Sequence, residues 1–159
     1  MHKKNLYRSI FILSCKLTTL LFILTLMTSC AKQEVINELM FQKNLLAGSG
    51  SYQNEKHTWK IDSLYINGLV YNLSTNAKSY YRVFYSNGAT TDRDGLNGTW
   101  EMPTVKDLKL KLYTYDNNGK IKDSIINKYQ IITLNAAQLH LKYDSTNLKQ
   151  DLYFISNNQ

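Results

Sequence analysis

The stretch "DLKLKLYTYDNNGKIKDSIINKYQIITL" (residues 107–134) decides the expected fold. Leucine and polar residues alternate at its start, which is the period-two pattern of a strand with one buried face. The alternation breaks at Asn118-Gly119, a dipeptide that tolerates the positive φ of tight hairpin turns, and resumes as far as Leu134. The stretch therefore predicts two antiparallel strands, 107–116 and 121–134, joined by a hairpin.

The same alternation recurs in short segments on both sides of this hairpin. These segments are 58–66, 79–85, 98–102, 139–144 and 151–156. Asn, Gly or Asp residues bound most of them, and Pro103 is expected to end the third. Seven or eight short strands with no long helix after residue 51 predict an all-β domain. A small antiparallel up-and-down barrel of about eight strands, or a sandwich, fits this pattern, because closure removes free strand edges.

The N-terminus has the three parts of an export signal. A basic start contains Lys3, Lys4 and Arg8, an apolar core runs over residues 17–27, and small residues then precede Cys30. The apolar run is shorter than the roughly 20 residues that a transmembrane helix needs. We therefore predict a signal peptide over residues 1–29.

The segment "LMTSC" (26–30) resembles a bacterial lipobox, with Met27 where Leu is usual. The resemblance implies a diacylglyceryl group on the Cys30 sulfur and an acyl chain, such as palmitate, on its amino group. Two or three chains anchor a protein stably, because each buried methylene contributes about 0.8 kcal/mol. The alternatives are an unmodified Cys30 behind an ordinary signal peptide, or an uncleaved anchor.

Removal of the signal changes the charge of the chain. Four of the 19 basic residues and none of the 12 acids leave with it, so the net charge falls from +7 to +3. The remaining lysines alternate with apolar residues, and no concentrated basic patch favours nucleic-acid binding. Cys15 is also lost, which leaves no second cysteine for a disulfide or a thiolate metal site.

Residues 30–50 are expected to form a lipidated tether ahead of a barrel domain over 51–159. Apolar residues recur at helical spacing within 31–47, and "GSGS" at 48–51 predicts a break. The residues after Cys30 lack the Asp that retains lipoproteins at the inner membrane in enteric-type sorting. We therefore expect the protein to be anchored at the outer membrane of a bacterial cell envelope, on either its periplasmic or its outer face.

Landmarks along the chain resemble the bacterial lipocalin-like lipoprotein family over residues 45–156. They are "LLAGSG" (45–50), "HTWKIDSLYING" (57–68), "FYSNGATT" (84–91), Gly98-Thr99-Trp100, "YQIITLNAAQLHLKY" (129–143) and "LYFIS" (152–156). The insertion at 52–56 departs from the family pattern. The resemblance implies a barrel whose interior holds its own side chains or one small ligand, and it implies no catalysis.

Two tryptophans and the segment 80–84 supply the candidate ligand site. Trp59 and Trp100 would line the mouth of an apolar cavity, with Tyr80, Arg82 and Phe84 across from them. The alternative is that both tryptophans pack in a solid core, which is the commoner role of large aromatic residues in a small barrel.

Strand periodicity leaves the direction of Arg82 open. If Phe84 faces inward, Tyr80 and Arg82 share its face, and the buried cation would suit an acidic lipid or carboxylate ligand. Tyr81, Val83 and Tyr85 make an equally good inward face, which would leave Arg82 in solvent.

Little in the chain favours catalysis or metal binding. His57 and His140 lie in different segments without a paired nucleophile, and both are expected at the surface. The run 92–101 hints at a calcium loop but lacks the ligands of an EF-hand at two positions. Ser145, in an Asp-Ser-Thr triplet, resembles an O-glycosylation signal of some bacteria, although a chance match is the better explanation. No cofactor is expected.

We therefore expect a non-catalytic envelope lipoprotein that binds a small apolar or amphiphilic ligand. The alternative is a solid-core interaction module that docks an envelope protein complex or inhibits a foreign enzyme. This alternative is supported by a tyrosine-rich exterior and by long loops expected at 67–79 and 86–98.

Overall fold

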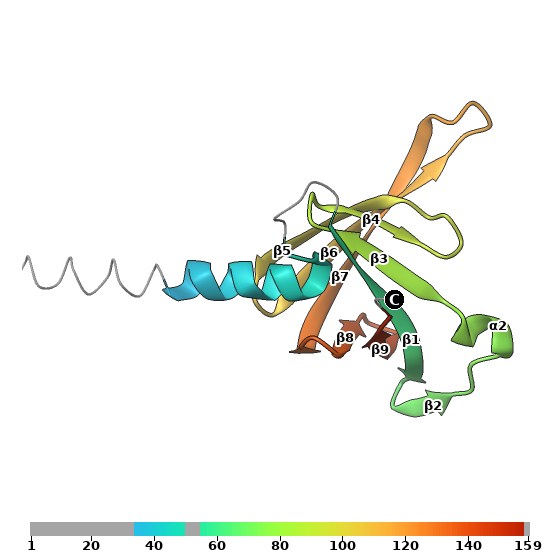
Figure 1. The fold of residues 1–159 in the computed structure, drawn as a ribbon. Helices are drawn as coiled ribbons and strands as arrows, with labels where there is room; N and C mark the ends of the chain where they lie inside the picture. The colour runs from blue at the N-terminus through green and yellow to red at the C-terminus, as the bar shows by residue number, and fades with distance from the viewer. Residues whose placement is uncertain (1–33, 50–54, 158–159) are drawn as a thin grey trace, which may run out of the picture. The chain divides into compact units, whose positions relative to one another are not determined.

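The computed structural model describes residues 34–49 and 55–157, which form a helix and a closed sheet (Figure 1). The helix covers residues 34–47. The strands are β1 (Lys56–Ile66), β2 (Leu69–Tyr71), β3 (Tyr81–Tyr85), β4 (Ala89–Asp92), β5 (Gly98–Thr104), β6 (Asp107–Tyr115), β7 (Ile121–Leu134), β8 (Gln138–Asp144) and β9 (Lys149–Ser156). A single helical turn, α2 (Thr75–Lys78), lies between β2 and β3.

Antiparallel pairing of β1 with β9 closes the sheet into a barrel of eight strands, and β2 is an additional strand on β1. Residues 56–60 of β1 pair with β3, as in Lys60 with Tyr81, and residues 59–66 pair with β9, as in Leu64 with Leu152. Each remaining strand pairs with the next one in the chain. The expected up-and-down barrel is confirmed, and the sandwich is wrong.

The predicted hairpin is present, with β6 and β7 paired from Asp107–Gln130 to Tyr115–Ile121. Its turn contains Gly119 at φ 74°, the conformation that made Asn118-Gly119 a turn signal.

Two segments that were expected to be loops contain regular structure. The first holds β2 and α2, and the second holds β4. The sequence of β4, "ATTD", lacks the large apolar residues that mark a buried strand. Thr90 is nevertheless buried. Its hydroxyl is satisfied there, because it donates to the backbone carbonyl of Val83 at 2.8 Å.

Pro103 does not end β5, as the sequence had suggested, but lies inside it. The pairing with β6 shifts register between Glu101 and Thr104, so two residues of β5 face one of β6. Such a bulge accommodates proline, because the missing N–H is not needed there for a ladder hydrogen bond.

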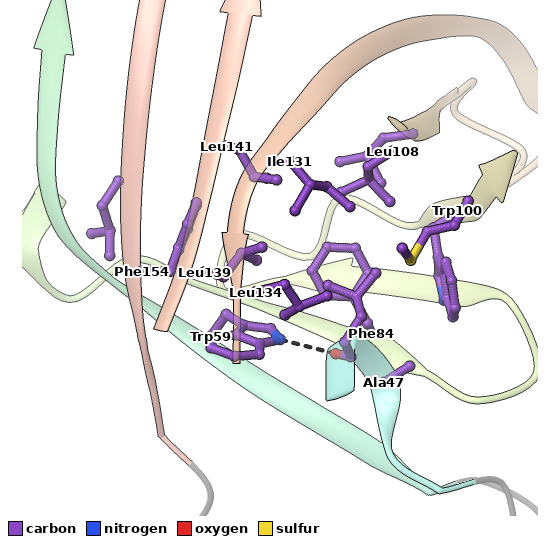
Figure 2. Packing of buried hydrophobic residues seen from close by; sticks show 14 of the residues in the cluster. Ala47, Trp59, Phe84, Trp100, Leu108, Ile131, Leu134, Leu139, Leu141 and Phe154 are labelled. Carbon is purple, nitrogen blue, oxygen red and sulfur yellow. Dashed lines mark hydrogen bonds between the residues drawn. The ribbon is translucent and has the colours of Figure 1, made fainter. Parts of the chain in front are cut away.

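One apolar cluster fills the barrel interior (Figure 2). It includes the end of the helix, where Leu46 and Ala47 are fully buried. The indole Nε1–H of Trp59 donates to the Leu46 carbonyl at 2.9 Å, so this residue satisfies one of the free carbonyls that every helix end leaves. The compact unit of the fold begins at Leu39, within the segment expected to be a tether.

Truncation of the helix end tests how much it contributes to the barrel. We expect Leu46→Ala to lower the free energy of unfolding by about 2–5 kcal/mol, because the lost side chain leaves a cavity in a closed core. Leu69→Ala in β2 is the matched control, since Leu69 is 75% exposed and its loss should cost less than about 0.5 kcal/mol. Urea unfolding measures both, and equal effects would contradict the packing described.

Candidate functional site

A buried polar cluster lies on the inward side of β3 and β4. Arg82 and Asp92 are direct cross-strand partners, so their side chains share a face. The Arg82 Nη2 donates to Asp92 Oδ2 at 3.1 Å and to the Tyr80 hydroxyl at 2.6 Å. The Tyr80 hydroxyl in turn donates to Asp92 Oδ2 at 3.1 Å. The three side chains therefore form a closed hydrogen-bonded triangle.

Both carboxylate oxygens of Asp92 accept hydrogen bonds from other groups of the protein. Its Oδ1 accepts from the backbone N–H groups of Asp94 and Leu96 at 3.0 and 2.9 Å, which shapes the turn after β4. The carboxylate on which the calcium hypothesis depended thus has its partners within the protein. Across residues 34–49 and 55–157, no three His, Cys, Asp or Glu side chains lie close enough together to hold a metal ion.

Arg82 is not fully satisfied by this triangle. The residue is 8% exposed, and its Nη1 is buried with no hydrogen-bond partner among the described residues. A buried donor without an acceptor costs about 1–3 kcal/mol, and more when the group is charged. Strand periodicity left the direction of Arg82 open, and the structure shows that its side chain points inward. Its Nη1 is a hydrogen-bond donor without an acceptor there.

A cavity of about 50 Å³ adjoins this cluster. Ten residues line it, and most of their side chains are apolar. They are Trp59, Tyr80, Arg82, Phe84, Leu110, Tyr129, Leu139, Leu141, Leu152 and Phe154. A water molecule needs only about 10–15 Å³ of such space, whereas drug-sized ligands occupy pockets of about 300–1,000 Å³. The cavity therefore has room for a few waters or a few heavy atoms of a ligand.

Four of the five predicted ligand residues, Trp59, Tyr80, Arg82 and Phe84, surround this cavity. Trp100 lies elsewhere in the core, where it packs edge-on against Phe84 with ring centroids 6.0 Å apart. Its indole N–H donates to the Tyr85 carbonyl at 2.9 Å. Trp100 therefore has the packing role that was the alternative for both tryptophans.

Tyr129 was not predicted as a site residue, although it lines the cavity. Burial raises its pKa, while the positive charge of Arg82 opposes that rise. Burial also raises the pKa of Tyr80 to about 12, again against the lowering effect of Arg82. Both phenols therefore remain protonated at neutral pH and can act as hydrogen-bond donors. The alternation of Tyr129 with Ile131 was the available signal for its inward position.

The prediction that both histidines lie at the surface is wrong for His57. This residue is 7% exposed and stacks on Trp59 with ring centroids 4.1 Å apart. Burial lowers its pKa, against the opposing effect of a hydrogen bond to the Leu45 backbone. His57 thus belongs to the contact between the helix end and the barrel.

His140 faces away from Leu139 and Leu141, as expected, but it is only partly exposed. Its Nε2 lies 3.0 Å from Asp151 Oδ1, and its ring stacks on Tyr153 at 4.0 Å. The two aromatic rings line a depression of about 220 Å³ together with Asp62, the extra residue in a bulge of β1. Among the described residues, neither histidine is part of an arrangement that resembles a catalytic triad. His57 Nε2 does lie 2.9 Å from Ser156 Oγ, but the other hydrogen bond of the His57 ring is to the Leu45 backbone and not to a carboxylate.

Cys30 and the predicted signal peptide lie outside the described residues. Among the residues that are described, no helix is both long and apolar enough to span a bilayer. Comparison of the chain with protein-family models, curated proteins and solved structures finds no match.

The raised pKa of Tyr80 predicts a loss of stability in alkaline solution. Above pH 10 the unfolded chain releases the tyrosine proton, whereas folded Tyr80 keeps it to about pH 12. Stability should therefore fall between pH 10 and 12, by about 2–3 kcal/mol from this residue. Urea unfolding at several pH values measures the slope.

The variant Tyr80→Phe should show a shallower fall than the wild type in this pH range. Tyr71→Phe is the control, because Tyr71 lies exposed in β2 and should leave the slope unchanged. A Tyr80→Phe protein with the wild-type slope would contradict the assignment.

Proposed function

We propose that the protein is a lipocalin-like lipoprotein of the bacterial cell envelope, lipidated at Cys30 and held at the outer membrane. Its barrel binds a small amphiphilic ligand and catalyses no reaction. The anchor rests on the three-part signal and the lipobox-like segment that ends at Cys30. The closed barrel with a polar group at an internal cavity supports the binding role.

The observation that carries the binding proposal is the unpartnered Nη1 of Arg82 beside the cavity. A ligand that offers one oxygen acceptor would supply the missing hydrogen bond. Its apolar part would lie against Trp59, Phe84 and Leu141, which line the same space. This combination of one polar contact and an apolar wall is the general composition of small-molecule sites.

The charge balance at the site favours a neutral acceptor over a carboxylate. Arg82 is already paired with Asp92, whose side chain is 4% exposed, so the pair carries no net charge. A ligand with a full negative charge would be repelled by Asp92 at close range in a medium of low dielectric constant. An ester carbonyl, amide or hydroxyl group therefore fits the site better than the acidic lipid expected from Arg82 alone.

The size of the cavity limits what enters without movement. About 50 Å³ accepts the polar end of a ligand, and we propose that a longer chain enters by displacing the segment before β3, which ends at the cavity-lining Tyr80. In this segment Leu73 packs against the core, and the guanidinium of Arg93 donates to Asn76 and Ser79 around α2. These contacts are few and near the surface, as in segments that open locally at low cost.

A second candidate function is a solid interaction module that docks an envelope protein or inhibits a foreign enzyme. It is favoured by the nearly complete filling of the interior, where Trp59 and Phe84 are 0% and 1% exposed. Large apolar side chains also remain exposed on several strands. In this case the cavity would hold only water.

The mass of the mature protein tests the anchor. Protein extracted from membranes of its own host should begin at Cys30 and exceed the mass of the 130-residue polypeptide by two or three acyl chains and a glyceryl group. Cys30→Ser is the control and should remain unprocessed. A mature protein that retains Met1, or carries an unmodified Cys30, would contradict the proposal.

Native mass spectrometry of the same material tests the ligand. We expect a bound small molecule in the wild type, and at least tenfold lower occupancy in Arg82→Lys. This variant keeps the positive charge opposite Asp92 but loses the Nη1 donor, and a hydrogen bond from a charged group contributes about 1.5–3 kcal/mol. Arg93→Lys is the matched control and should retain the ligand.

Two results would contradict ligand binding at Arg82. One is a wild type that carries no bound molecule, and the other is equal occupancy in Arg82→Lys. The first result would favour the interaction module, which cross-linking in intact cells then tests through recovery of a specific partner.

A further inference from the structure

The distal part of the β6–β7 hairpin extends beyond the closed barrel. β5 pairs with β6 only as far as Leu112, and β8 pairs with β7 only from Gln130 onward. Beyond Leu112 and its partner Ile125, the two strands form a ribbon with no further described strand on either side, and its tip projects from the barrel (Figure 1). Both faces of this ribbon are therefore available for contact.

Cross-strand pairing determines which side chains share the outer face of the ribbon. Lys111 is opposite Ile126, and Tyr115 is opposite Ile121, so each pair lies on one side of the sheet. The core residues Leu110 and Leu112 alternate with Lys111 and lie on the other side. This outer face continues from the ribbon onto the part of the hairpin that β5 flanks, and we name it the basic ribbon face. It consists of Lys109, Lys111, Tyr113, Tyr115, Ile121, Ser124, Ile126 and Lys128.

The basic ribbon face exposes large apolar side chains. Ile121 is 59% exposed, Ile126 is 51% exposed and Tyr115 is 45% exposed. Lysine on exposed strands protects them against pairing with other chains, and that role would account for the lysines alone. It does not account for exposed isoleucines between them, which increase the tendency to aggregate unless another surface covers them.

The net charge of the mature protein is concentrated in this hairpin. Residues 109–128 contain five lysines and two aspartates, a balance of +3. The chain from Cys30 onward has 15 basic and 12 acidic residues, which is also +3. The mature chain outside residues 109–128 therefore has no net charge, so the excess positive charge lies in this segment. Glu101 on β5 lies 3.5 Å from Lys109 and offsets part of the charge on this face.

We propose that the basic ribbon face docks on an anionic membrane surface, with Ile121, Ile126 and Tyr115 inserted among the lipid headgroups. Each lysine near such a surface strengthens binding by about fivefold, and exposed apolar side chains add to it. Tyrosine is favoured at membrane interfaces for the same amphipathic reason. A second copy of this chain fits less well, because it would bring lysines against lysines.

This inference depends on one part of the proposed function, namely the lipid anchor that keeps the barrel near a membrane. Docking would then fix the orientation of a domain otherwise held by its tether. The ribbon can bind an anionic surface without the anchor as well, so the two proposals can fail separately.

The test uses the mature lipidated protein with a single added thiol. Ile121→Cys, labelled with an environment-sensitive fluorophore, is reconstituted into vesicles of phosphatidylcholine alone or of equal parts phosphatidylcholine and phosphatidylglycerol. We expect the fluorophore emission to shift to the blue only in the anionic vesicles. Acrylamide should quench the fluorophore at least twofold less in these vesicles than in the neutral ones. Val70→Cys on β2, where Val70 is 64% exposed, is the matched control and should respond equally in both.

A second variant identifies the charge as the cause. Adding Lys111→Gln and Lys128→Gln to the labelled protein should remove the protection, because two lysines account for about 30-fold in surface binding. Flotation with neutral vesicles reports the anchor independently of the label. Equal quenching at position 121 in both vesicle types would overturn the inference, and so would protection that appears without lipid as protein concentration rises.

Discussion

Closure of the sheet between β1 and β9 is the constraint on which the other features depend. A barrel of eight strands has an interior just wide enough to be filled by side chains, so every inward position competes for the same small volume. In this protein the end of the helix enters that volume as well, through Leu46 and its hydrogen bond from Trp59. A cavity of about 50 Å³ remains beside Arg82.

A buried ion pair in so confined a core requires an explanation other than stability. Replacement of such pairs by apolar residues of similar volume is often neutral or stabilising, because desolvation offsets the attraction. The Arg82–Asp92 pair also leaves one donor unsatisfied, which makes it more costly than a complete network. The proposed binding role for the free Nη1 would account for both the pair and its incompleteness, and it would turn an unfavourable feature of the empty barrel into a source of affinity.

Much of the fold could be predicted from local pattern, because alternation and Asn-Gly turns are properties of neighbouring residues. The hairpin of 107–134 and the strands that contain Trp59, Phe84 and Leu141 were found this way. β4 was missed because threonine fills its inward position, and Pro103 was taken as a strand end because a bulge is not visible in a single strand.

The site was harder to predict, since it depends on pairing between strands. Periodicity grouped Arg82 with Phe84 but also allowed the opposite face. Asp92 was considered only as part of an incomplete calcium loop, because nothing in the sequence shows that it lies across from Arg82. His57 was expected at the surface, because the alternation within its own strand does not show that the helix end around Leu45 contacts its ring.

The central claim is that Arg82 Nη1 meets an acceptor that the protein itself does not supply. A high-resolution crystal structure of protein purified from its own host tests it most directly, through the electron density around this atom. The account predicts density for an oxygen-bearing organic molecule within hydrogen-bonding distance of Nη1, with its apolar part against Trp59 and Phe84. Density for water alone, or a protein acceptor on Nη1, would contradict it.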